Sequence, residues 1–301
     1  MQLDNLCAGL EKCKTEYVKS EPMSRHTTFK IGGNADVFIS IKTEDELKTV
    51  LELTNEYGIP CFILGKGSNL LVSDSGIEGA VLCLDGLDEI KITDETVVCG
   101  AGASLKNVCL AARDAGLSGL EFAYGIPGSV GGAVYMNAGA YGGEMSQVVL
   151  SAKAVDKNGR VFEFSNEQLQ LGYRTSIFKN SSLIVTSVTF KLKHGDKQKI
   201  KADMDDFLSR RQNKQPLEYP SAGSTFKRPQ GYFAGALIEK NNLKGVSVGG
   251  AQVSQKHAGF IINTGSATCL DVLSLIKKVQ NTVKNADGVD LEPEVIFVGR
   301  K

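Results

Sequence analysis

The chain has 301 residues, and its 34 lysines and arginines balance 34 aspartates and glutamates. This length suffices for two or three compact lobes, and a hydrophobic fraction of 42% argues against a disordered chain. The zero net charge gives no sign of nucleic acid or an anionic membrane surface as a partner. No basic stretch precedes an apolar one at the N-terminus, and no apolar run approaches the roughly 20 residues of a membrane span. We therefore expect a cytoplasmic monomer that acts on small molecules, without membrane insertion.

The cysteines and histidines indicate neither disulfides nor a metal site. The seven cysteines are odd in number and scattered, several of them inside apolar runs, which is typical of buried free thiols in a reducing compartment. No C-x-x-C motif or Cys/His cluster is present, and His26, His194 and His257 lie far apart in sequence. We expect no metal.

The first part of the chain predicts a strand–helix–strand unit after a short N-terminal helix. Residues 35–41 alternate apolar and polar side chains as a half-buried strand does. Thr43 and Glu46 form a capping box at the start of the following helix. The next strand, 61–64, runs directly into a glycine loop at 65–69, and the carboxyl ends of such strands are where α/β folds bind ligands.

The middle of the chain predicts further sheet around one helix. An Asn-Gly pair between two β-rich arms indicates a hairpin with a type I′ turn. In chain order, the expected elements are strands at 80–84 and 96–100, a helix capped by Ser104, the hairpin 151–164 with its turn at Asn158-Gly159, and a strand at 183–192.

The sequence changes character near residue 195, where we expect a charged amphipathic connecting helix at 196–211. Beyond it we expect a helix at 232–240, short strands within 246–263, a helix capped by Thr268 with Leu270, Leu273, Ile276, Val279 and Val283 facing inward, and a strand at 295–298. These elements suggest three domains: two cofactor-binding lobes at 1–85 and 86–194, and a substrate-binding domain at 195–301.

Eight glycines fall within residues 119–143, a density that a packed helix or strand would not use. Glycine lets main-chain N–H groups approach a ligand closely, and successive N–H groups form anion sites. The earlier loop, 65–69, is neither a Rossmann fingerprint, because Leu70 stands where the third glycine belongs, nor a Walker loop. Both loops together predict a phosphate or cofactor cradle; the alternative for 65–69 is a tight turn without a ligand.

Six motifs resemble the UDP-N-acetylenolpyruvoylglucosamine reductase (MurB) family over essentially the whole chain. They are HTTFKIGG (26–33), LGKGSNLLVSDSG (64–76), EFAYGIPGSVGGAVYMNAGAYGGE (121–144), YRTSIF (173–178), AGSTFKRP (222–229) and LEPEVIFVG (291–299). The resemblance implies an α+β protein with an FAD-binding fold of the vanillyl-alcohol-oxidase (PCMH) type in two α/β lobes, followed by a C-terminal α+β substrate-binding lobe.

The resemblance also implies a reaction. It is the NADPH-dependent reduction of UDP-N-acetylglucosamine enolpyruvate to UDP-N-acetylmuramate in peptidoglycan biosynthesis. In this family FAD takes a hydride from NADPH and passes it from N5 to the terminal enolpyruvyl carbon. Charge then develops on the substrate carboxylate as an enediolate, and the neighbouring carbon must be protonated.

Three residues match the catalytic groups of the family. Arg174 corresponds to the arginine that binds the carboxylate, and its planar fork of donors suits that anion. Ser224 corresponds to the proton donor, and Glu294 to the catalytic glutamate, whose pKa we expect burial to raise. The alternatives are a surface ion pair for Arg174 and a turn residue for Ser224. Glu292 is interpreted as structural or facing solvent.

The resemblance places other residues around the ligands. Lys214 lies where the family holds the diphosphate. Lys214 and Lys227 are also the candidates for the charged neighbours that make Ser224 a competent proton donor. Tyr173 lines the substrate or nicotinamide site, or packs against the flavin lobe, and His257 faces the substrate or is simply a packed or surface residue. The expected FAD contacts are Gly65, Lys66, Gly67, Ser68, Asn69, Gly125, Pro127, Gly128, Ser129 and Gly132, and the expected substrate contacts are Tyr173, Arg211, Lys214, Arg228 and His257.

Only 49 residues separate Arg174 from Ser224, which is too short for the tyrosine-bearing insertion found in one branch of the family. We therefore assign the compact type, in which another group must cover the uridine end. Two other functions stay open on the sequence: a flavin oxidase or dehydrogenase of the same fold with a different substrate, and a non-catalytic protein that binds nucleotide sugars.

Overall fold

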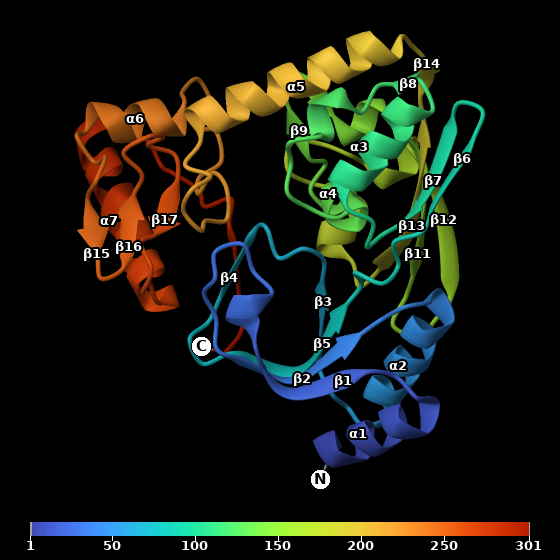
Figure 1. Ribbon diagram of the computed structural model, residues 1–301. Coiled ribbons are helices and arrows are strands. Elements are labelled where there is room, and N and C mark those ends of the chain that lie inside the picture. Colours follow the sequence, from blue (N-terminus) through green and yellow to red (C-terminus); the bar gives the residue numbers. More distant parts are fainter. Residues whose placement is uncertain (1, 301) are drawn as a thin grey trace. The chain divides into compact units, whose positions relative to one another are not determined.

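The computed structural model describes residues 2–300 (Figure 1). They form two compact units. The first unit contains residues 2–19, 37–66 and 79–211, and the second contains 20–36, 67–78 and 212–300. The chain passes between the units inside strands as well as in loops. The boundaries 1–85, 86–194 and 195–301 stay a prediction, because this division follows spatial contacts rather than one cut along the sequence.

Helices and strands alternate along the chain. The helices are α1 (Gln2–Cys13), α2 (Glu44–Glu56), α3 (Leu105–Asp114), α4 (Val130–Tyr135), α5 (Lys197–Lys214), α6 (Ala234–Lys240) and α7 (Cys269–Asp287). The strands are β1 (Tyr17–Pro22), β2 (Asn34–Ser40), β3 (Cys61–Leu64), β4 (Leu70–Val72), β5 (Ile77–Cys83), β6 (Ile90–Thr93), β7 (Thr96–Gly100), β8 (Leu117–Ser118), β9 (Gly139–Ala140), β10 (Gly143–Glu144), β11 (Val149–Val155), β12 (Val161–Ser165), β13 (Ile184–Lys191), β14 (Lys193–His194), β15 (Ser247–Val248), β16 (Ala251–Val253), β17 (Ile261–Asn263) and β18 (Ile296–Val298).

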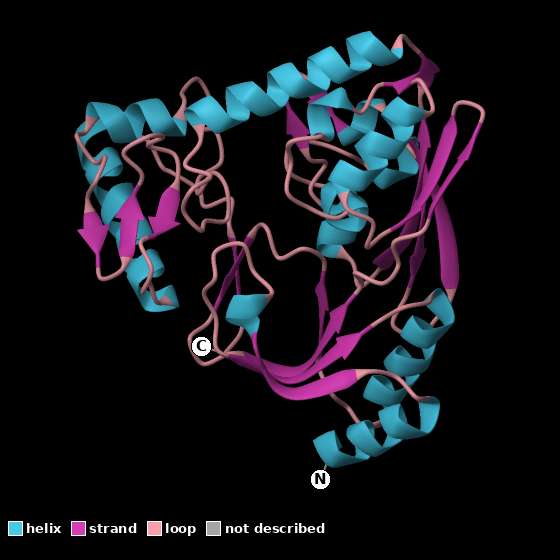
Figure 2. Cartoon of the chain, viewed as in Figure 1, coloured by secondary structure: helices cyan, strands magenta, loops and turns pink. Residues whose placement is uncertain are grey.

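The largest sheet lies in the first unit. Its five strands have the order β12-β11-β13-β7-β6, and each neighbouring pair is antiparallel (Figure 2). Helices α3 and α4 pack against this sheet and bury Val108, Ala112 and Val134 in the core of the unit. This core is continuous with the apolar sides of α1 and α2.

A second sheet has the order β1-β2-β5-β3. Strands β3 and β5 are parallel, from Cys61 opposite Ala80 to Leu64 opposite Cys83. Val37, Ile39 and Ile41 are fully buried, as the alternation of residues 35–41 predicts. The predicted strand–helix–strand unit is therefore present, with β5 inserted between its two strands.

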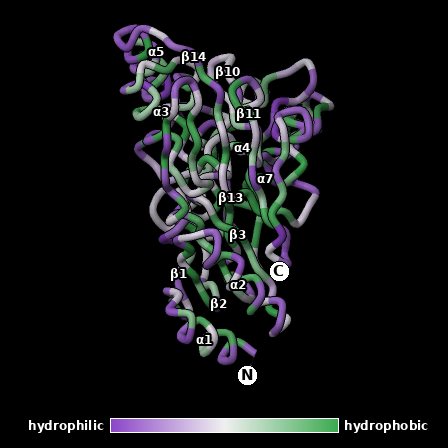
Figure 3. The backbone as a smooth tube through the Cα atoms, turned by 90° about the vertical axis from the view of Figure 1, so that its right-hand side faces the viewer, coloured by the Kyte–Doolittle hydropathy of each residue, from purple (hydrophilic) through white to green (hydrophobic). Residues whose placement is uncertain are grey.

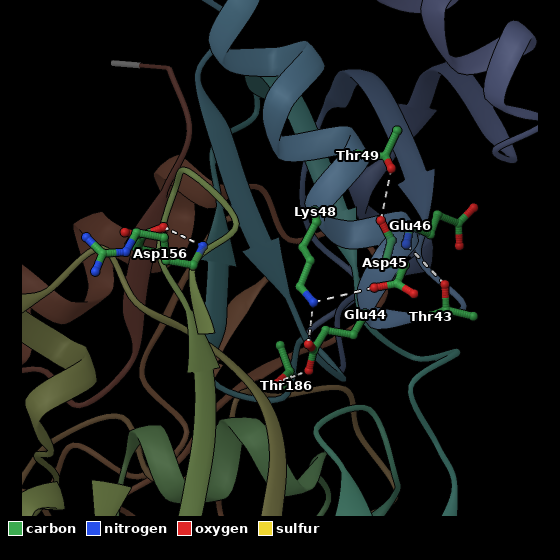
Figure 4. A network of polar contacts seen from close by, with 9 residues as sticks. Thr43, Glu44, Asp45, Glu46, Lys48, Thr49, Asp156 and Thr186 are labelled. Atoms are coloured by element: carbon green, nitrogen blue, oxygen red, sulfur yellow. Dashed lines mark hydrogen bonds and ion pairs between the residues drawn. The ribbon is translucent and has the colours of Figure 1, made fainter. Parts of the chain in front are cut away.

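The start of α2 is fixed to the large sheet by a polar network (Figure 4). The Thr43 hydroxyl caps the helix by accepting from the Glu46 amide, at 3.1 Å. Glu44 accepts from Thr186 at 2.9 Å and pairs with Lys48 at 2.7 Å. Burial disfavours the charged carboxylate, but the Lys48 and Thr186 bonds outweigh it, so the pKa of Glu44 is lowered. The Glu46 carboxylate accepts from the Lys42 amide at 2.6 Å, so the capping box is shifted by one residue from the prediction.

The β11–β12 hairpin differs from the prediction. Residues 156–160 connect the strands, and Gly159 alone has a positive φ there, of 77°, whereas a type I′ turn needs both central residues in that region. The Asp156 carboxylate accepts from the Asn158 and Arg160 amides at 2.8 and 3.0 Å. This side chain favours a type I turn followed by a left-handed glycine over the predicted turn.

Helix α5 is mainly hydrophilic, and purple predominates where it lies at the top of Figure 3. Among its 18 residues only Ile200 and Met204 are buried. This agrees with the predicted charged connecting helix, which is extended by three residues beyond the expected end at 211.

The second unit has its own apolar core around α7 and the antiparallel sheet β15-β16-β17. Strand β18 pairs in parallel with β4, from Ile296 opposite Leu70 to Val298 opposite Val72. The Asp74 carboxylate accepts from the Cys269 and Leu270 amides at the start of α7, at 2.8 and 3.1 Å. Segments more than 190 residues apart in sequence therefore close this unit.

Two predictions about side-chain exposure are wrong. On α7, Ile276, Val279 and Val283 are buried as predicted, but Leu270 is 68% exposed and Leu273 is 37% exposed. Val272 and Leu275 are buried in their place, because the inward stripe begins at Cys269 rather than at Leu270. Among the cysteines, all of which are free, five are buried and Cys13 and Cys61 are exposed. Burial raises the pKa of Cys99 to about 12.

Within residues 2–300, no helix is long and apolar enough to cross a membrane. In the same range, no three His, Cys, Asp or Glu side chains gather in a way that could hold a metal ion.

Candidate active site

Gly65, the first residue of the predicted loop 65–69, lies beside the glycine segment within the first unit. A Cβ atom added at Gly65 would lie 2.5 Å from the Ser129 hydroxyl oxygen, so a side chain there would displace this hydroxyl. Ser129 is buried and caps α4 by accepting from the Gly132 amide at 3.4 Å. This contact brings the end of β3 and the segment 125–132 together, as a shared cradle requires.

The segment 125–132 is held by backbone hydrogen bonds to the loop before α3. The Leu105 amide donates to the Gly128 carbonyl at 3.0 Å, and the Val130 amide donates to the Ala103 carbonyl at 2.9 Å. A Cβ at Gly131 would lie 2.8 Å from that of Ala101. Gly132 is exposed and Pro127 is exposed, so this rigid segment presents part of its backbone outward.

Lys66 forms an ion pair with Asp85, a residue that no sequence pattern indicates. Its Nζ pairs with Asp85 Oδ2 at 2.9 Å, while Oδ1 of the same carboxylate is buried without a hydrogen-bond partner among residues 2–300. Lys66 therefore keeps two of its three N–H donors for a ligand, and Asp85 limits where its side chain lies.

Gly67, Ser68 and Asn69 belong to the second unit. Gly67 has a φ of 59°, and a Cβ there would lie 2.0 Å from the His26 carbonyl oxygen. Both the positive φ and the close carbonyl oxygen therefore require glycine at position 67, whether or not a ligand binds there. The Asn69 side-chain amide donates to the Glu294 carbonyl at 3.1 Å, so this loop residue also fixes the backbone of a predicted catalytic residue.

Gly67→Ala is expected to be far more destabilising than Gly142→Ala. Both glycines have positive φ, 59° and 87°, but nothing lies within 4 Å of a Cβ at Gly142. The control should lose about 1–2 kcal/mol from left-handed strain, and Gly67→Ala roughly 2–5 kcal/mol because the clash with a carbonyl is added. Urea unfolding followed by circular dichroism measures both, and equal losses would contradict the packing argument.

Ser224 and Glu294 lie on neighbouring segments of the second unit. The Thr225 amide donates to the Gly259 carbonyl, and the Glu294 amide donates to the Thr225 carbonyl, both at 2.8 Å. Phe226 lies opposite Pro293 in the same short pairing. Because Thr225 follows Ser224 directly, these bonds hold the backbone segments of Ser224 and Glu294 side by side. Ser224 is exposed and Glu294 is partly buried.

The predicted structural role of Glu292 is consistent with its position. Its side chain is 70% exposed and forms an ion pair with Lys227. The Lys227 amide also donates to the Glu292 carbonyl, at 2.8 Å. Because Lys227 is already paired with the Glu292 carboxylate, it is less suited than Lys214 to assist proton donation by Ser224.

Arg174 occupies a strained turn in the first unit. Gly172 and Thr175 exchange two backbone hydrogen bonds of 3.1 and 3.2 Å around Tyr173 and Arg174. The φ of Arg174 is 55°, a conformation that favours glycine. Its guanidinium lies 5.4 Å from the centre of the Tyr173 ring, which is 57% exposed, so the alternative of a buried packing role for Tyr173 is wrong.

Arg211 faces the glycine segment within the first unit. Its Cδ lies 3.3 Å from the Cβ position of Gly125. Desolvation lowers the pKa of the guanidinium, with a small opposing effect of Tyr141. Tyr141 itself stacks on Phe207 of α5 at 4.8 Å between ring centres. A half-buried cation beside an open backbone suits a negatively charged ligand.

The other predicted substrate contacts lie in the second unit. Lys214 is exposed at the end of α5. Arg228 is exposed, and its guanidinium lies 4.0 Å from the centre of the Phe233 ring, which is itself 62% exposed. An exposed aromatic ring stacked on a guanidinium offers a flat surface of the kind that planar ligands contact.

His257 is partly buried beside Phe260, 5.0 Å away between ring centres. Its Nδ1 accepts from the Gly259 amide at 3.1 Å, so the proton of the neutral ring is on Nε2, available to a ligand. Burial lowers the pKa of His257 below its ordinary value of 6.5. The side chain is therefore neutral at pH 7.

This shift has a consequence for stability. Because the unfolded chain binds a proton at His257 near pH 6.5 and the folded chain binds it only at lower pH, stability is lost as the pH falls below about 6.5. His257→Asn is expected to reduce the fall in melting temperature between pH 7.5 and 5.5. His194→Asn, at an exposed position, is the matched control. An unchanged slope in His257→Asn would contradict the prediction.

The FAD that the resemblance implies fits the residues present. Gly132 is exposed and has no side chain, and the partly exposed Lys66 supplies a cation after β3, so phosphate oxygens can approach this part of the first unit. The amides of Val130, Gly131 and Gly132 are already bound to the Ala103 and Ala101 carbonyls and to the Ser129 hydroxyl. The predicted FAD contacts of the first unit are Gly65, Lys66, Gly125, Pro127, Gly128, Ser129 and Gly132, and those of the second unit are Gly67, Ser68 and Asn69. These contacts stay a prediction.

Two residues were missed by the sequence analysis. Asp85 follows a strand of ordinary composition, and no local signal indicates that it pairs with Lys66. Asn137 is 2% exposed and donates from its side chain to the Gly172 carbonyl at 3.1 Å. A polar residue inside the glycine segment was the only available signal for it.

Two protein-family models match the chain. One is described as the C-terminal domain of UDP-N-acetylenolpyruvoylglucosamine reductase and matches residues 215–298. The other is an FAD binding domain and matches residues 35–165. The two matches divide the chain between a cofactor-binding and a family-specific part.

Proteins named UDP-N-acetylenolpyruvoylglucosamine reductase match this chain along most of their length. The UDP-N-acetylenolpyruvoylglucosamine reductase of Clostridium botulinum strain 657 is 54% identical over 281 residues, which covers 93% of this chain and 92% of the relative. The enzyme of Clostridium perfringens strain SM101 is 50% identical over 279 residues, with the same coverage. Identity at this level over nearly the full length is that of one family.

The solved structure of UDP-N-acetylenolpyruvylglucosamine reductase (MurB) from Thermus caldophilus is similar to this chain, with a TM-score of 0.80 and 37% identity. The match covers 94% of this chain and 98% of that one. Together with the FAD-domain match, it confirms the expected α+β class with an FAD-binding fold. The chain belongs to the UDP-N-acetylenolpyruvoylglucosamine reductase (MurB) family.

Proposed function

We propose that the protein reduces UDP-N-acetylglucosamine enolpyruvate to UDP-N-acetylmuramate with NADPH, using Arg174, Ser224 and Glu294. That it is an FAD-dependent reductase follows from its family. The observation that carries the residue assignment is the backbone pairing of Ser224 and Glu294 segments, which places an exposed hydroxyl and a partly buried carboxyl in one layer. When bound, FAD supplies the two-electron carrier between NADPH and the enolpyruvyl group.

Ser224 donates its hydroxyl proton to the carbon that bears the substrate carboxylate. A serine hydroxyl is a weak acid in water, so its proton moves only toward a strongly basic carbon held in line with it. The exposed position of Ser224 leaves its Oγ open to a substrate. The hydrogen bond from the Thr225 amide to the Gly259 carbonyl fixes the backbone next to Ser224.

Arg174 binds the carboxylate and stabilises the charge that grows on it during the reaction. Its place at the tip of a two-residue turn, beside the exposed Tyr173 ring, suits a group that meets a ligand. Glu294 supports the same developing charge by sharing a hydrogen bond or proton with it. The Asn69 amide and the Thr225 carbonyl hold the Glu294 backbone for that purpose.

The nucleotide end of the substrate is assigned to cationic and polar side chains. Lys214 and Arg228 are exposed cations, and Arg211 is a half-buried one, so all three suit a diphosphate. His257 offers a neutral Nε2–H donor, and Tyr173 lines the reacting end. We further propose a cytoplasmic monomer with lobes at 1–85, 86–194 and 195–301, of the compact type without the tyrosine insertion.

An anaerobic experiment tests the proposed reaction in two halves. One equivalent of NADPH should bleach the flavin absorbance of the purified protein, and UDP-N-acetylglucosamine enolpyruvate should restore it at once. Glu294→Gln should bleach like wild type but recover at least 10²-fold more slowly. Glu292→Gln, at the exposed neighbouring carboxylate, is the matched control and should recover like wild type. If the wild-type flavin stays bleached, the substrate assignment is wrong and a flavin oxidase with another substrate is favoured.

A further inference from the structure

The turn that carries Arg174 stores backbone strain. With Gly172 and Thr175 joined by hydrogen bonds, Arg174 takes the third position of a four-residue turn, at a φ of 55°. Turns of this kind need a positive φ at that position and favour glycine there. A side chain in the left-handed region costs about 1–2 kcal/mol, so neighbouring contacts must hold the turn in this shape.

Three side chains tie the turn to surrounding backbone. Asn137 Nδ2 donates to the Gly172 carbonyl at 3.1 Å, on the near side of the turn. Lys179 Nζ donates to the carbonyl of Arg174 itself at 3.2 Å. The Ser176 hydroxyl donates to the Tyr135 carbonyl, at the end of α4, at 2.8 Å.

Asn137 is the centre of this arrangement. It is 2% exposed, and its Oδ1 accepts from the Ser146 amide at 2.9 Å. Its own φ is 42°, which asparagine tolerates better than most residues. Both ends of its amide group are therefore engaged, so the side chain has one orientation. It joins the glycine segment, the loop at Ser146 and the turn before Arg174.

We propose that Asn137 is a positioning residue that holds the strained turn at Gly172–Thr175 and so aims the Arg174 side chain. The inference rests on the proposed role of Arg174. Without the Asn137 bond, the Gly172 carbonyl keeps only the bond from the Thr175 amide, so the turn is restrained less and Arg174 relaxes toward an unstrained φ. A displacement of about 1 Å at a catalytic group costs up to about 100-fold in rate.

The test uses Asn137→Asp, which keeps an oxygen for the Ser146 amide and removes the donor to Gly172. Asn166→Asp is the matched control. Asn166 lies in the same unit and donates through Nδ2 to the Ser146 and Val149 carbonyls at 2.9 and 2.6 Å, without touching the turn. The readouts are flavin content, melting temperature, bleaching by NADPH and recovery with the enolpyruvate substrate.

Asn137→Asp is expected to bleach at the wild-type rate and to recover 10- to 100-fold more slowly at saturating substrate, while Asn166→Asp recovers like wild type. In an Arg174→Ala background, Asn137→Asp should slow recovery by no more than about 2-fold further, because its effect passes through Arg174. Equal slowing in both asparagine variants, or an undiminished effect in the Arg174→Ala background, would overturn the proposal.

Lys179→Gln provides a second route if Asn137→Asp does not bind FAD. It replaces the charged donor to the Arg174 carbonyl with a shorter, neutral one, and Lys179→Met removes the donor; both should slow recovery in the same non-additive way, Lys179→Met more. Full wild-type recovery in Lys179→Gln would overturn the proposal in that case. If Arg174→Ala alone recovers like wild type, the failure is that of the catalytic assignment of Arg174 instead.

Discussion

Ser224→Ala is expected to lower the rate of flavin recovery by roughly 10²–10⁴-fold while leaving bleaching by NADPH unchanged. General acid catalysis by a positioned side chain contributes about this factor, and alanine removes the hydroxyl, which carries the only exchangeable proton of the Ser224 side chain. The fold should survive, because Ser224 is exposed and its neighbour Thr225 carries the backbone hydrogen bonds to Gly259 and Glu294.

Stopped-flow absorbance under anaerobic conditions measures the two steps separately. Ser247→Ala, at an exposed serine of the same unit, is the matched control and should match wild type in both. Recovery of Ser224→Ala at the wild-type rate would remove Ser224 as the proton donor. A loss in both steps would point instead to damage at the flavin site.

Arg174→Gly is expected to separate stability from activity. Glycine takes a φ of 55° without strain, so the gain of about 1–2 kcal/mol offsets the roughly 0.5–1 kcal/mol of extra backbone entropy in the unfolded chain. The melting temperature should therefore stay equal to wild type or rise. Recovery of the flavin should fall by about 10²–10³-fold, because the group that balances the growing carboxylate charge is gone.

The matched control for this prediction is Gln170→Gly. Gln170 also has a positive φ, of 49°, and is exposed, but it lies outside the turn of Arg174. It should gain similar stability with unchanged recovery. A drop in melting temperature of several degrees in Arg174→Gly would mean that the guanidinium contributes more to stability than the turn conformation costs.

The elements with strong local signals were predictable from the sequence. The caps Thr43, Ser104 and Thr268 begin their helices as expected, because the N-cap bond involves residues only three apart. Strand β1 was missed because it shows no clear apolar alternation, and β6 was missed although it alternates, because the alternation extends over four residues only. The inward stripe of α7 was misjudged at its first two residues only, because Leu270 and Leu273 fit a helical period as well as Val272 does, and tertiary packing decides between the two phases.

The candidate site divides in the same way. Glycine runs and motif residues stand out in a sequence because their composition is unusual. The prediction of a type I′ turn at Asn158-Gly159 was wrong because the Asp156 carboxylate accepts hydrogen bonds from the Asn158 and Arg160 amides, which favours a type I turn followed by a left-handed glycine. The roles of Asn137, Asp85 and Asn69 could not be predicted, because each partner lies 19 to 225 residues away along the chain and its position depends on the completed fold.

The parallel pairing of β4 with β18 affects how the protein is made. During synthesis the segment with β4 emerges early, whereas its partner strand is translated more than 200 residues later. The first unit has all its segments once residue 211 is available, but the second unit waits for residue 298. Until then, the apolar residues Phe29, Ile31 and Leu71 lack the core that covers them. A ribosome stalled between codons 212 and 298 would therefore hold a chain prone to aggregation.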